Sequence, residues 1–491
     1  MASRDKKRPN VMVIMTDDQG AWALGCAGNS EIRTPHLDGL AKRGIRFENF
    51  FCASPVCSPA RASFLTGRIP SQHGVHDWIR KGNISDSEGE YRGVDRPIEY
   101  LEGMLGYSDV LKQNGYTCGL SGKWHLGAQE MSQKGFDFWY VFAFGGGDYY
   151  DAPMVENGSL TNKPDYLTDV ITDGALEFLR EVDEAEEPFY LSVHYTAPHS
   201  PWNSENHPDT FLDLYEDCPF ESCPDQEVHP WQINSAPVGV GKRRQENLQG
   251  YFAAVTAMDA GVGRLLERLD TLGLRDNTLI VFTSDNGMNM GHHGIWGKGN
   301  GTYPQNMYDS SVKVPFIVSH PRCVREGVVE SGLFSHYDFF PTLIDYLGLE
   351  NYAIDGLPGR SFAALLKGND LSRRDNVVVF DEYGPVRMIR SRDSKYVHRF
   401  PEGPHEFYDL KADPGETTNV IDEAEYRGLV DKMRLDLENW FREYINPSID
   451  GSIEPVTGNG QLDWAGKKSG GRQRYNGDFS LYHEVGDEFE S

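Results

Sequence analysis

The chain has 491 residues, of which 74 are Asp or Glu and 47 are Lys or Arg, so its formal net charge at pH 7 is −27. With 39% hydrophobic and 12% aromatic residues it has the composition of a folded protein, long enough for one large domain and a smaller one. The acidic balance argues against nucleic acid or an anionic membrane as a partner, because both require a basic face.

Short continuous apolar segments predict strands that are buried on both faces. They cover residues 11–15, 189–193, 279–282 and 314–318. Helical periodicity lies between them, at 166–181 and 248–272. Strands that alternate with helices predict an α/β fold with a large, mostly parallel sheet sandwiched by helices.

The pattern changes after about Gly348. Short strands separated by turn residues are predicted at 377–380, 386–391, 396–400 and 407–410. They predict a small antiparallel sheet, followed by a packed helix over 422–444 and a tail rich in Gly, Asp and Glu without predicted elements. We therefore predict a large α/β domain over residues 1–375 and a smaller C-terminal α+β subdomain over 376–491.

The sequence has few signals for export or membrane insertion. The first ten residues are charged and polar, the seven cysteines are sparse and odd in number, and no apolar stretch has the length of a membrane span. Asn83, Asn157 and Asn300 begin glycosylation acceptor patterns, which we interpret as chance matches. We expect a cytoplasmic protein with reduced thiols and no membrane partner.

The segment from Cys57 to Arg61 reads Cys-Ser-Pro-Ala-Arg and begins a predicted helix. A helix N-terminus offers unpaired N–H groups to an anion and lowers the pKa of a thiol. Cys57 is therefore a candidate reactive cysteine with Arg61 one turn on, although a structural cysteine at a helix start fits the same residues.

Two predicted strands end in acidic or amide side chains: Asp17-Asp18 follows the first, and Asp285-Asn286 follows the segment 279–282. Ligands bind beyond the carboxyl ends of such strands, and hard oxygen atoms suit Ca²⁺ or Mg²⁺. Helix capping is the alternative role for Asp and Asn after a strand. Adjacent carboxylates repel each other without a cation, which favours a metal site.

Cations and proton donors occur in further segments at the ends of candidate strands. They are Lys123, His125, His199 and Lys298. Together they suit a tetrahedral oxyanion. His194 also follows a strand, but its alternation with apolar residues fits a buried structural role equally well. His73 and His76 fit either a substrate pocket or the surface.

In chain order, these segments resemble the formylglycine-dependent (type I) sulfatases of the alkaline phosphatase superfamily, from Asn10 to about Tyr444. The segments that carry the resemblance are Pro9-Asn10-Val11 with Asp17-Asp18, Thr34-Pro35-His36-Leu37-Asp38, Cys57 to Gly67, Gly122 to His125, Asp285-Asn286-Gly287, Val312-Lys313-Val314-Pro315, and Tyr408-Asp409-Leu410 before Asp413-Pro414. The Cys-x-Pro-x-Arg pattern followed by Leu-Thr-Gly is highly specific, and Ala60 is a mild variation where the family often has Ser.

The resemblance implies a sulfuric ester hydrolase in which a formylglycine-generating enzyme or radical maturase converts Cys57 to formylglycine. It implies one Ca²⁺, held by Asp17, Asp18, Asp285, Asn286 and the modified residue 57. In the family, a hydroxyl of the hydrated aldehyde attacks sulfur, and the metal offsets sulfate charge and helps to deprotonate that hydroxyl.

The resemblance also implies roles for the remaining polar residues. His199 and Lys298 would donate the proton to the leaving alcohol or stabilise its charge, and Lys123 would hold sulfate oxygens. Arg61 would steady residue 57, while His125 would take the proton from the second hydroxyl and so expel sulfate.

Within the family, the chain most resembles bacterial carbohydrate sulfatases, which implies an exo-acting O-sulfatase on sulfated mono- or oligosaccharides of the glycosaminoglycan type. An aryl sulfatase and a phosphonate or phosphodiester hydrolase are the alternatives. A thiolate phosphatase would not need the acidic pairs, and intact catalytic positions argue against a non-catalytic glycan binder.

Aromatic residues around the motifs could stack on a sugar or belong to the core, and the glycine loop 145–147 could line a pocket or form a plain turn. The aromatics are Trp78, Trp124, Trp139, Tyr140, Tyr149, Tyr150 and Trp202. The net charge disfavours long polyanions along the surface, while Arg61, Lys123 and Lys298 with a cation would form a local positive pocket.

Overall fold

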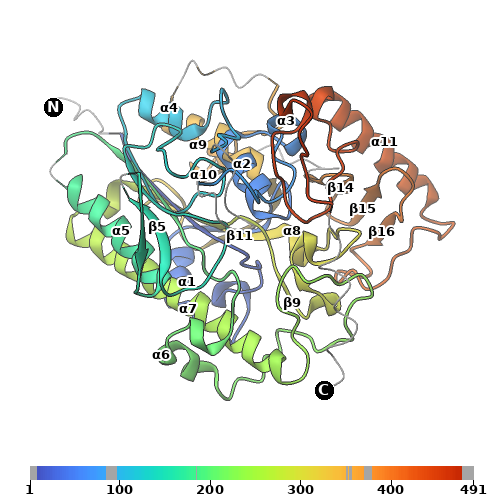
Figure 1. The fold of residues 1–491 in the computed structure, drawn as a ribbon, viewed down its shortest axis with the longest axis horizontal. Coiled ribbons are helices and arrows are strands. Elements are labelled where there is room, and N and C mark those ends of the chain that lie inside the picture. The colour runs from blue at the N-terminus through green and yellow to red at the C-terminus, as the bar shows by residue number, and fades with distance from the viewer. Residues whose placement is uncertain are drawn as a thin grey trace.

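The computed structural model of the protein describes residues 8–84, 97–156, 158–183, 185–349, 352, 356–369 and 379–477. A large sheet with helices on both faces forms most of the molecule, and a small sheet lies with helix α11 (Arg427–Tyr444) at one end (Figure 1). This arrangement confirms the predicted α/β class and the smaller C-terminal antiparallel sheet with its helix.

The large sheet has ten strands. In spatial order they are β12 (Val328–Ser335), β2 (Ile45–Phe51), β11 (Lys313–Ser319), β8 (Thr278–Ser284), β1 (Asn10–Thr16), β7 (Phe189–His194), β3 (Thr117–Lys123), β4 (Phe138–Phe142), β5 (Ala152–Glu156) and β6 (Ser159–Lys163). The pairs from β8 through β4 are all parallel, as predicted for the centre of the sheet.

The sheet as a whole is mixed, because β11, β5 and β6 run antiparallel to their neighbours. The strand predicted over 314–318 is therefore present, but in the opposite direction to β8. An apolar segment indicates burial on both faces and carries no information on strand direction, which the connecting chain decides.

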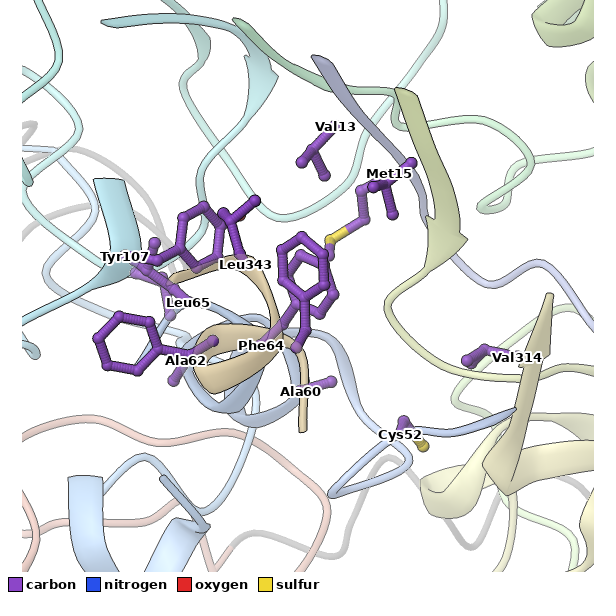
Figure 2. Packing of buried hydrophobic residues seen from close by; sticks show 14 of the residues in the cluster. Val13, Met15, Cys52, Ala60, Ala62, Phe64, Leu65, Tyr107, Val314 and Leu343 are labelled. Atoms are coloured by element: carbon purple, nitrogen blue, oxygen red, sulfur yellow. The ribbon is translucent and has the colours of Figure 1, made fainter. Parts of the chain in front are cut away.

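Successive residues of β1 point to opposite faces of the sheet, and each set packs against its own helices. Val11, Val13 and Met15 lie in a cluster with residues of α2, α4 and α9, part of which Figure 2 shows. Met12 and Ile14 lie in a second cluster with residues of α1, α5 and α7. Both clusters are almost completely buried, so the sheet forms the centre of a three-layer core.

The helices are short apart from three. They are α1 (Pro35–Lys42), α2 (Cys57–Thr66), α3 (Pro70–His73), α4 (Tyr107–Gln113), α5 (Leu167–Glu181), α6 (Asp209–Leu212), α7 (Lys242–Thr271), α8 (Asp309–Val312), α9 (Phe339–Leu347), α10 (Ala363–Leu366) and α11. All ten residues of α2 are buried, and Phe64 stacks on Phe339 of α9 with ring centroids 4.4 Å apart. This packing holds the N-terminus of α2, and with it Cys57, in one place.

The small sheet pairs four strands in antiparallel order, β13 (Val379–Tyr383), β14 (Val386–Arg390), β15 (Ser394–Arg399) and β16 (Glu406–Asp409). Helix α11 covers it through Met433, Leu437 and Phe441. The predicted residues 377 and 378 lie outside the described residues, and a two-stranded ribbon, β9 (Asn289–Met290) with β10 (Trp296–Gly297), follows β8.

The chain beyond α11 returns to the segment that follows α3, although no element was predicted there. Gln461 forms a parallel bridge with Ile79, and its side chain accepts from the backbone N–H of His76 at 2.8 Å and donates to Gly74 O at 2.9 Å. Gln461 and Val456 are buried. Specific hydrogen bonds rather than periodic apolar residues hold this segment, so a search for helical or strand patterns does not find it.

Among the described helices, none combines the length and the apolar character that crossing a membrane requires.

Candidate active site

The acidic residues lie where two neighbouring strands end. β1 and β8 are parallel and in register, with Thr16 opposite Ser284, so the residues that follow them lie side by side. The backbone N–H of Asp18 donates to Asp285 Oδ1 at 3.1 Å, and Asn286 Nδ2 donates to Asp18 Oδ1 at 2.8 Å. The structure thus brings together both acidic pairs that the sequence placed at strand ends.

This cluster has the composition of a site for a hard divalent cation. Carboxylate oxygens of Asp17, Asp18 and Asp285 lie within 4.8 Å of one another, and all three residues are buried. The Oδ1 atom of Asn286 is also buried and has no hydrogen-bond partner in the part of the chain that the structure describes. Three carboxylates and an unpaired amide oxygen fit a cation with oxygen ligands.

Three buried cations face the carboxylates. Lys123 pairs with Asp17, Arg61 Nη2 lies 2.8 Å from Asp285 Oδ2, and Lys298 Nζ lies 2.6 Å from Asp18 Oδ1. Burial opposes ionisation of Asp17 and Asp18, but Lys123 beside the first and Lys298 beside the second lower both pKa values. Asp17 and Asp18 are therefore ionised beside buried positive charges.

Cys57 is the first residue of α2, and its side chain lies among these carboxylates and cations. Its Sγ lies 3.4 Å from Asp17 Oδ1 and 2.7 Å from Lys298 Nζ. Burial, with Asp17 adding to it, raises the pKa of the thiol to about 12. The lowered thiol pKa that the helix start suggested is therefore wrong, because loss of solvation outweighs the helix N-terminus. An unmodified thiolate is a poor candidate for the nucleophile.

His125 has a defined tautomer. Its Nε2 lies 2.9 Å from the carbonyl oxygen of Ile79, and a carbonyl only accepts, so Nε2 carries the proton. Nδ1 is buried without a partner among the described residues. Burial, with Lys123 adding to it, lowers the pKa of the ring well below its usual value. Neutral His125 thus has a free lone pair at Nδ1, as a proton acceptor requires.

His199 and His194 lie in different environments. His199 lines a pocket that opens above Cys57. Its Nδ1 donates to Ser200 O at 2.7 Å, and its Nε2 lies 3.7 Å from Asp18 Oδ2. His194 is buried and lies between Ser192 Oγ at 2.7 Å and Lys123 O at 3.0 Å. His199 is therefore the histidine that a substrate can reach, and His194 supports the chain around Lys123.

His73 and His76 lie in neither of the predicted places. Both are buried outside the pocket, His73 against Ser63 Oγ at 3.0 Å and His76 against Ile449 O at 2.9 Å.

A cavity of about 670 Å³ opens above Cys57. Lys298, His125 and His199 line it together with Cys57. The glycine loop 145–147 also lines it, and a Cβ atom at Gly145 or Gly146 would collide with the ring of His125 or His199. The loop therefore forms a pocket wall, and its glycines let the backbone lie directly against the two histidines.

Two of the candidate aromatic residues, Trp78 and Tyr150, line the cavity, whereas Trp124, Trp139, Tyr149 and Trp202 are buried in the core. Several polar residues that line the cavity were not predicted from the sequence. They are Arg80, Asn83, Asp148, Asp151, Asn162, Asn234, Ser235, Asn300 and Asn459. They come from several separate segments of the chain, so only the fold brings them together.

The low pKa of His194 predicts a pH dependence of stability. Burial lowers this pKa to about 3, whereas an unfolded histidine titrates near 6.5. Between these values the unfolded chain binds a proton that the folded protein does not, so stability falls as the pH decreases, by about 1.4 kcal/mol per unit for this group. Urea unfolding at pH 7 and pH 5 should show a smaller loss in His194→Gln than in the wild type, by about 2 kcal/mol. Replacement of the exposed His36 by Gln is the control, and equal losses in all three proteins would contradict the prediction.

An α/β sheet whose central strands end in buried carboxylates, cations and histidines, beneath a pocket, defines a hydrolase for esters of a tetrahedral oxyanion. The model of the sulfatase family matches residues 9–349, and that of the C-terminal region of N-sulphoglucosamine sulphohydrolase matches residues 291–443. The chain belongs to the sulfatase family and is a sulfuric ester hydrolase.

Individual relatives cover nearly the whole chain. It is 28% identical over 524 residues to N-acetylglucosamine-6-O-sulfatase of Bacteroides thetaiotaomicron, covering 91% of this chain and 88% of that one. It is 31% identical over 455 residues to an ulvan-active sulfatase of Formosa agariphila, with coverages of 89% and 81%. A solved structure of a protein in complex with its substrate D-glucosamine-2-N,6-O-disulfate has a TM-score of 0.75 at 27% identity, with coverages of 91% and 100%.

Proposed function

We propose that the protein is an exo-acting O-sulfatase that hydrolyses sulfate monoesters of mono- or oligosaccharides, of the glycosaminoglycan type. The observation that carries the proposal is one pocket lined by two kinds of side chain. Cys57, Lys298 and the two histidines line it together with Trp78, Tyr150 and several amide side chains. The cations suit a sulfate group, and aromatic rings with amides suit a sugar. Two relatives named for carbohydrate substrates support this substrate class.

We infer that a maturation enzyme converts Cys57 to formylglycine, whose hydrated aldehyde supplies the nucleophilic hydroxyl. The raised pKa of the unmodified thiol argues against a Cys57 thiolate as the nucleophile, and the Cys-x-Pro-x-Arg pattern supports the modification. The side chains that would hold one Ca²⁺ are Asp17, Asp18, Asp285 and Asn286, with residue 57 completing the set. When bound, the ion would offset the negative charge of the sulfate group and favour loss of a proton from a hydroxyl beside it.

The remaining residues have positions that suit their proposed roles. Lys298 Nζ, 2.7 Å from Sγ of residue 57, can stabilise negative charge on the leaving oxygen, and His199 can hold a proton for it at Nε2. Lys123 and Arg61 hold Asp17 and Asp285 in place, and Lys123 can also attract sulfate oxygens.

The free lone pair of His125 Nδ1 can accept a proton from a hydroxyl at position 57 and so release sulfate. The Ile79 carbonyl that holds the opposite nitrogen keeps the proton of neutral His125 on Nε2, so the lone pair is free at Nδ1 before this transfer.

A substrate panel tests the proposal. The matured protein is assayed with 6-O-, 4-O-, 2-O- and N-sulfated sugars, with 4-nitrophenyl sulfate as the aryl ester and a phosphodiester for comparison. We expect at least one O-sulfated sugar to exceed the aryl ester in kcat/KM by about tenfold or more, since the amide side chains of the pocket wall can form hydrogen bonds with sugar hydroxyls but not with an aryl ring. Hydrolysis of the aryl ester alone, or faster hydrolysis of the phosphodiester, would overturn it.

A further inference from the structure

The pocket wall contains a buried hydrogen-bond acceptor that has no partner. Asn300 lines the cavity and is 4% exposed, and its Oδ1 makes no hydrogen bond within the described parts of the chain. A buried polar atom without a partner is rare in a folded protein and costs stability. Because Asn300 belongs to the pocket wall, a ligand bound there can supply the missing hydrogen-bond donor.

The orientation of the Asn300 amide is fixed by the chain beyond α11. Its Nδ2 donates to the carbonyl oxygen of Gly458 at 3.1 Å, and Trp78 Nε1 donates to the same carbonyl at 3.1 Å. A carbonyl accepts but cannot donate, so the amide nitrogen must face Gly458 and Oδ1 must point away from it.

Gly458 suits this contact because it has no Cβ. Its φ is +85°, and a Cβ atom there would lie 3.1 Å from Asn300 Cβ. The C-terminal segment therefore approaches Asn300 closely and holds its acceptor in one direction.

Asn300 also lies near the reacting centre. It follows Lys298 by two residues, and Lys298 Nζ is 2.7 Å from Cys57 Sγ. Asn83 repeats the pattern on another segment of the wall: its Nδ2 donates to Ile79 O at 3.2 Å, and its buried Oδ1 has no partner in the described ranges. Both amides thus turn their donors to backbone carbonyls and keep their acceptors free.

We propose that Asn300 determines substrate specificity: its Oδ1 accepts a hydrogen bond from a hydroxyl or amide N–H of the sugar that carries the sulfate. The proposal rests on the proposed carbohydrate sulfatase function and deepens it. An aryl sulfate without such a donor reaches the same base of the pocket but leaves Oδ1 unpaired. Asn300 therefore favours the hydrolysis of sulfated sugars, which carry a hydrogen-bond donor for Oδ1, over that of aryl sulfates, which carry none.

The test compares two substrates in two variants. Asn300→Ala removes the amide, and Asn300→Leu removes it at nearly constant volume. For the fastest sulfated sugar of the panel, both should lower kcat/KM by about tenfold or more, because one partner of a substrate hydrogen bond is lost. With 4-nitrophenyl sulfate, kcat/KM should stay within about twofold, because that ester has no donor for Oδ1.

Analogues of the same sulfated sugar that each lack one hydroxyl or one amide N–H complete a double-mutant cycle. With the wild type, one analogue should have a kcat/KM about tenfold below that of the parent sugar. With Asn300→Ala the same two substrates should differ little, because the variant already lacks that hydrogen bond. Asn247→Ala is the matched control, since Asn247 is buried and donates from Nδ2 to Pro237 O at 3.0 Å outside the pocket.

An equal loss of kcat/KM with the sugar and with 4-nitrophenyl sulfate would overturn the inference, because it would show that Asn300 supports Lys298 rather than binding the sugar. Unchanged kinetics would overturn it as well. A wild type that hydrolyses only the aryl ester would instead overturn the proposed function, so the two failures are distinguishable.

Discussion

Cys57→Ala should lower kcat for sulfate ester hydrolysis by at least about 10⁴-fold while the fold is retained, as removal of a catalytic nucleophile does. Cys57 is 2% exposed and lies at the base of the pocket, between Asp17 and Lys298. Alanine has no group that can be converted to an aldehyde hydrate, so the nucleophile is absent whatever the rest of the site does.

The measurement pairs kinetics with mass spectrometry of the peptide that spans residue 57. Protein coexpressed with a formylglycine-generating enzyme should contain formylglycine at this position, and its activity should rise with the modified fraction. Cys52→Ala is the matched control, because Cys52 is fully buried, lies five residues earlier and does not line the pocket. Full activity in Cys57→Ala, or in protein with only unmodified cysteine at 57, would contradict the mechanism.

Removal of the metal should produce the second large effect. Chelation of Ca²⁺ from the wild type, or the substitution Asp17→Asn, should lower activity by about 10³-fold, because the acidic cluster then lacks its ion or a ligand. Thermal unfolding gives an independent readout. Calcium at a hundred times its dissociation constant should add about 2.7 kcal/mol to the unfolding free energy of the wild type and much less to that of the variant.

Asp381→Asn is the control for this experiment. Asp381 is fully buried outside the pocket, and burial raises the pKa of its carboxyl well above the usual value. Its replacement should leave the calcium response intact. An equal calcium response in Asp17→Asn and the wild type would show that the ion binds elsewhere.

The residues of the site differ in how far their proximity could be predicted from the sequence. The residues at the base of the pocket occur in local motifs: Asp17-Asp18 and Asp285-Asn286 each follow an apolar strand, and Cys57 begins a Cys-x-Pro-x-Arg helix. Parallel strands in register bring such ends together, so chain order and strand pattern suffice to predict their proximity. The same patterns predicted the α/β class and the small C-terminal sheet.

Other features depend on packing and were not predictable. The direction of β11 is set by its connections, and the thiol pKa of Cys57 is set by burial beside Asp17, which outweighs the helix start. His194 and His199 are only five residues apart, yet one is enclosed beneath Lys123 and the other faces the cavity.

The sequence by itself therefore determined the class of fold, the family and the charged residues at the base of the pocket, because each depends on residues that are close in the chain or at the ends of paired strands. Only the tertiary structure decided the pocket wall, where the Gly458 carbonyl meets the Asn300 amide from a segment 158 residues away. That contact depends on long-range backbone approach and on a glycine without a Cβ, and neither leaves a periodic signal in the sequence.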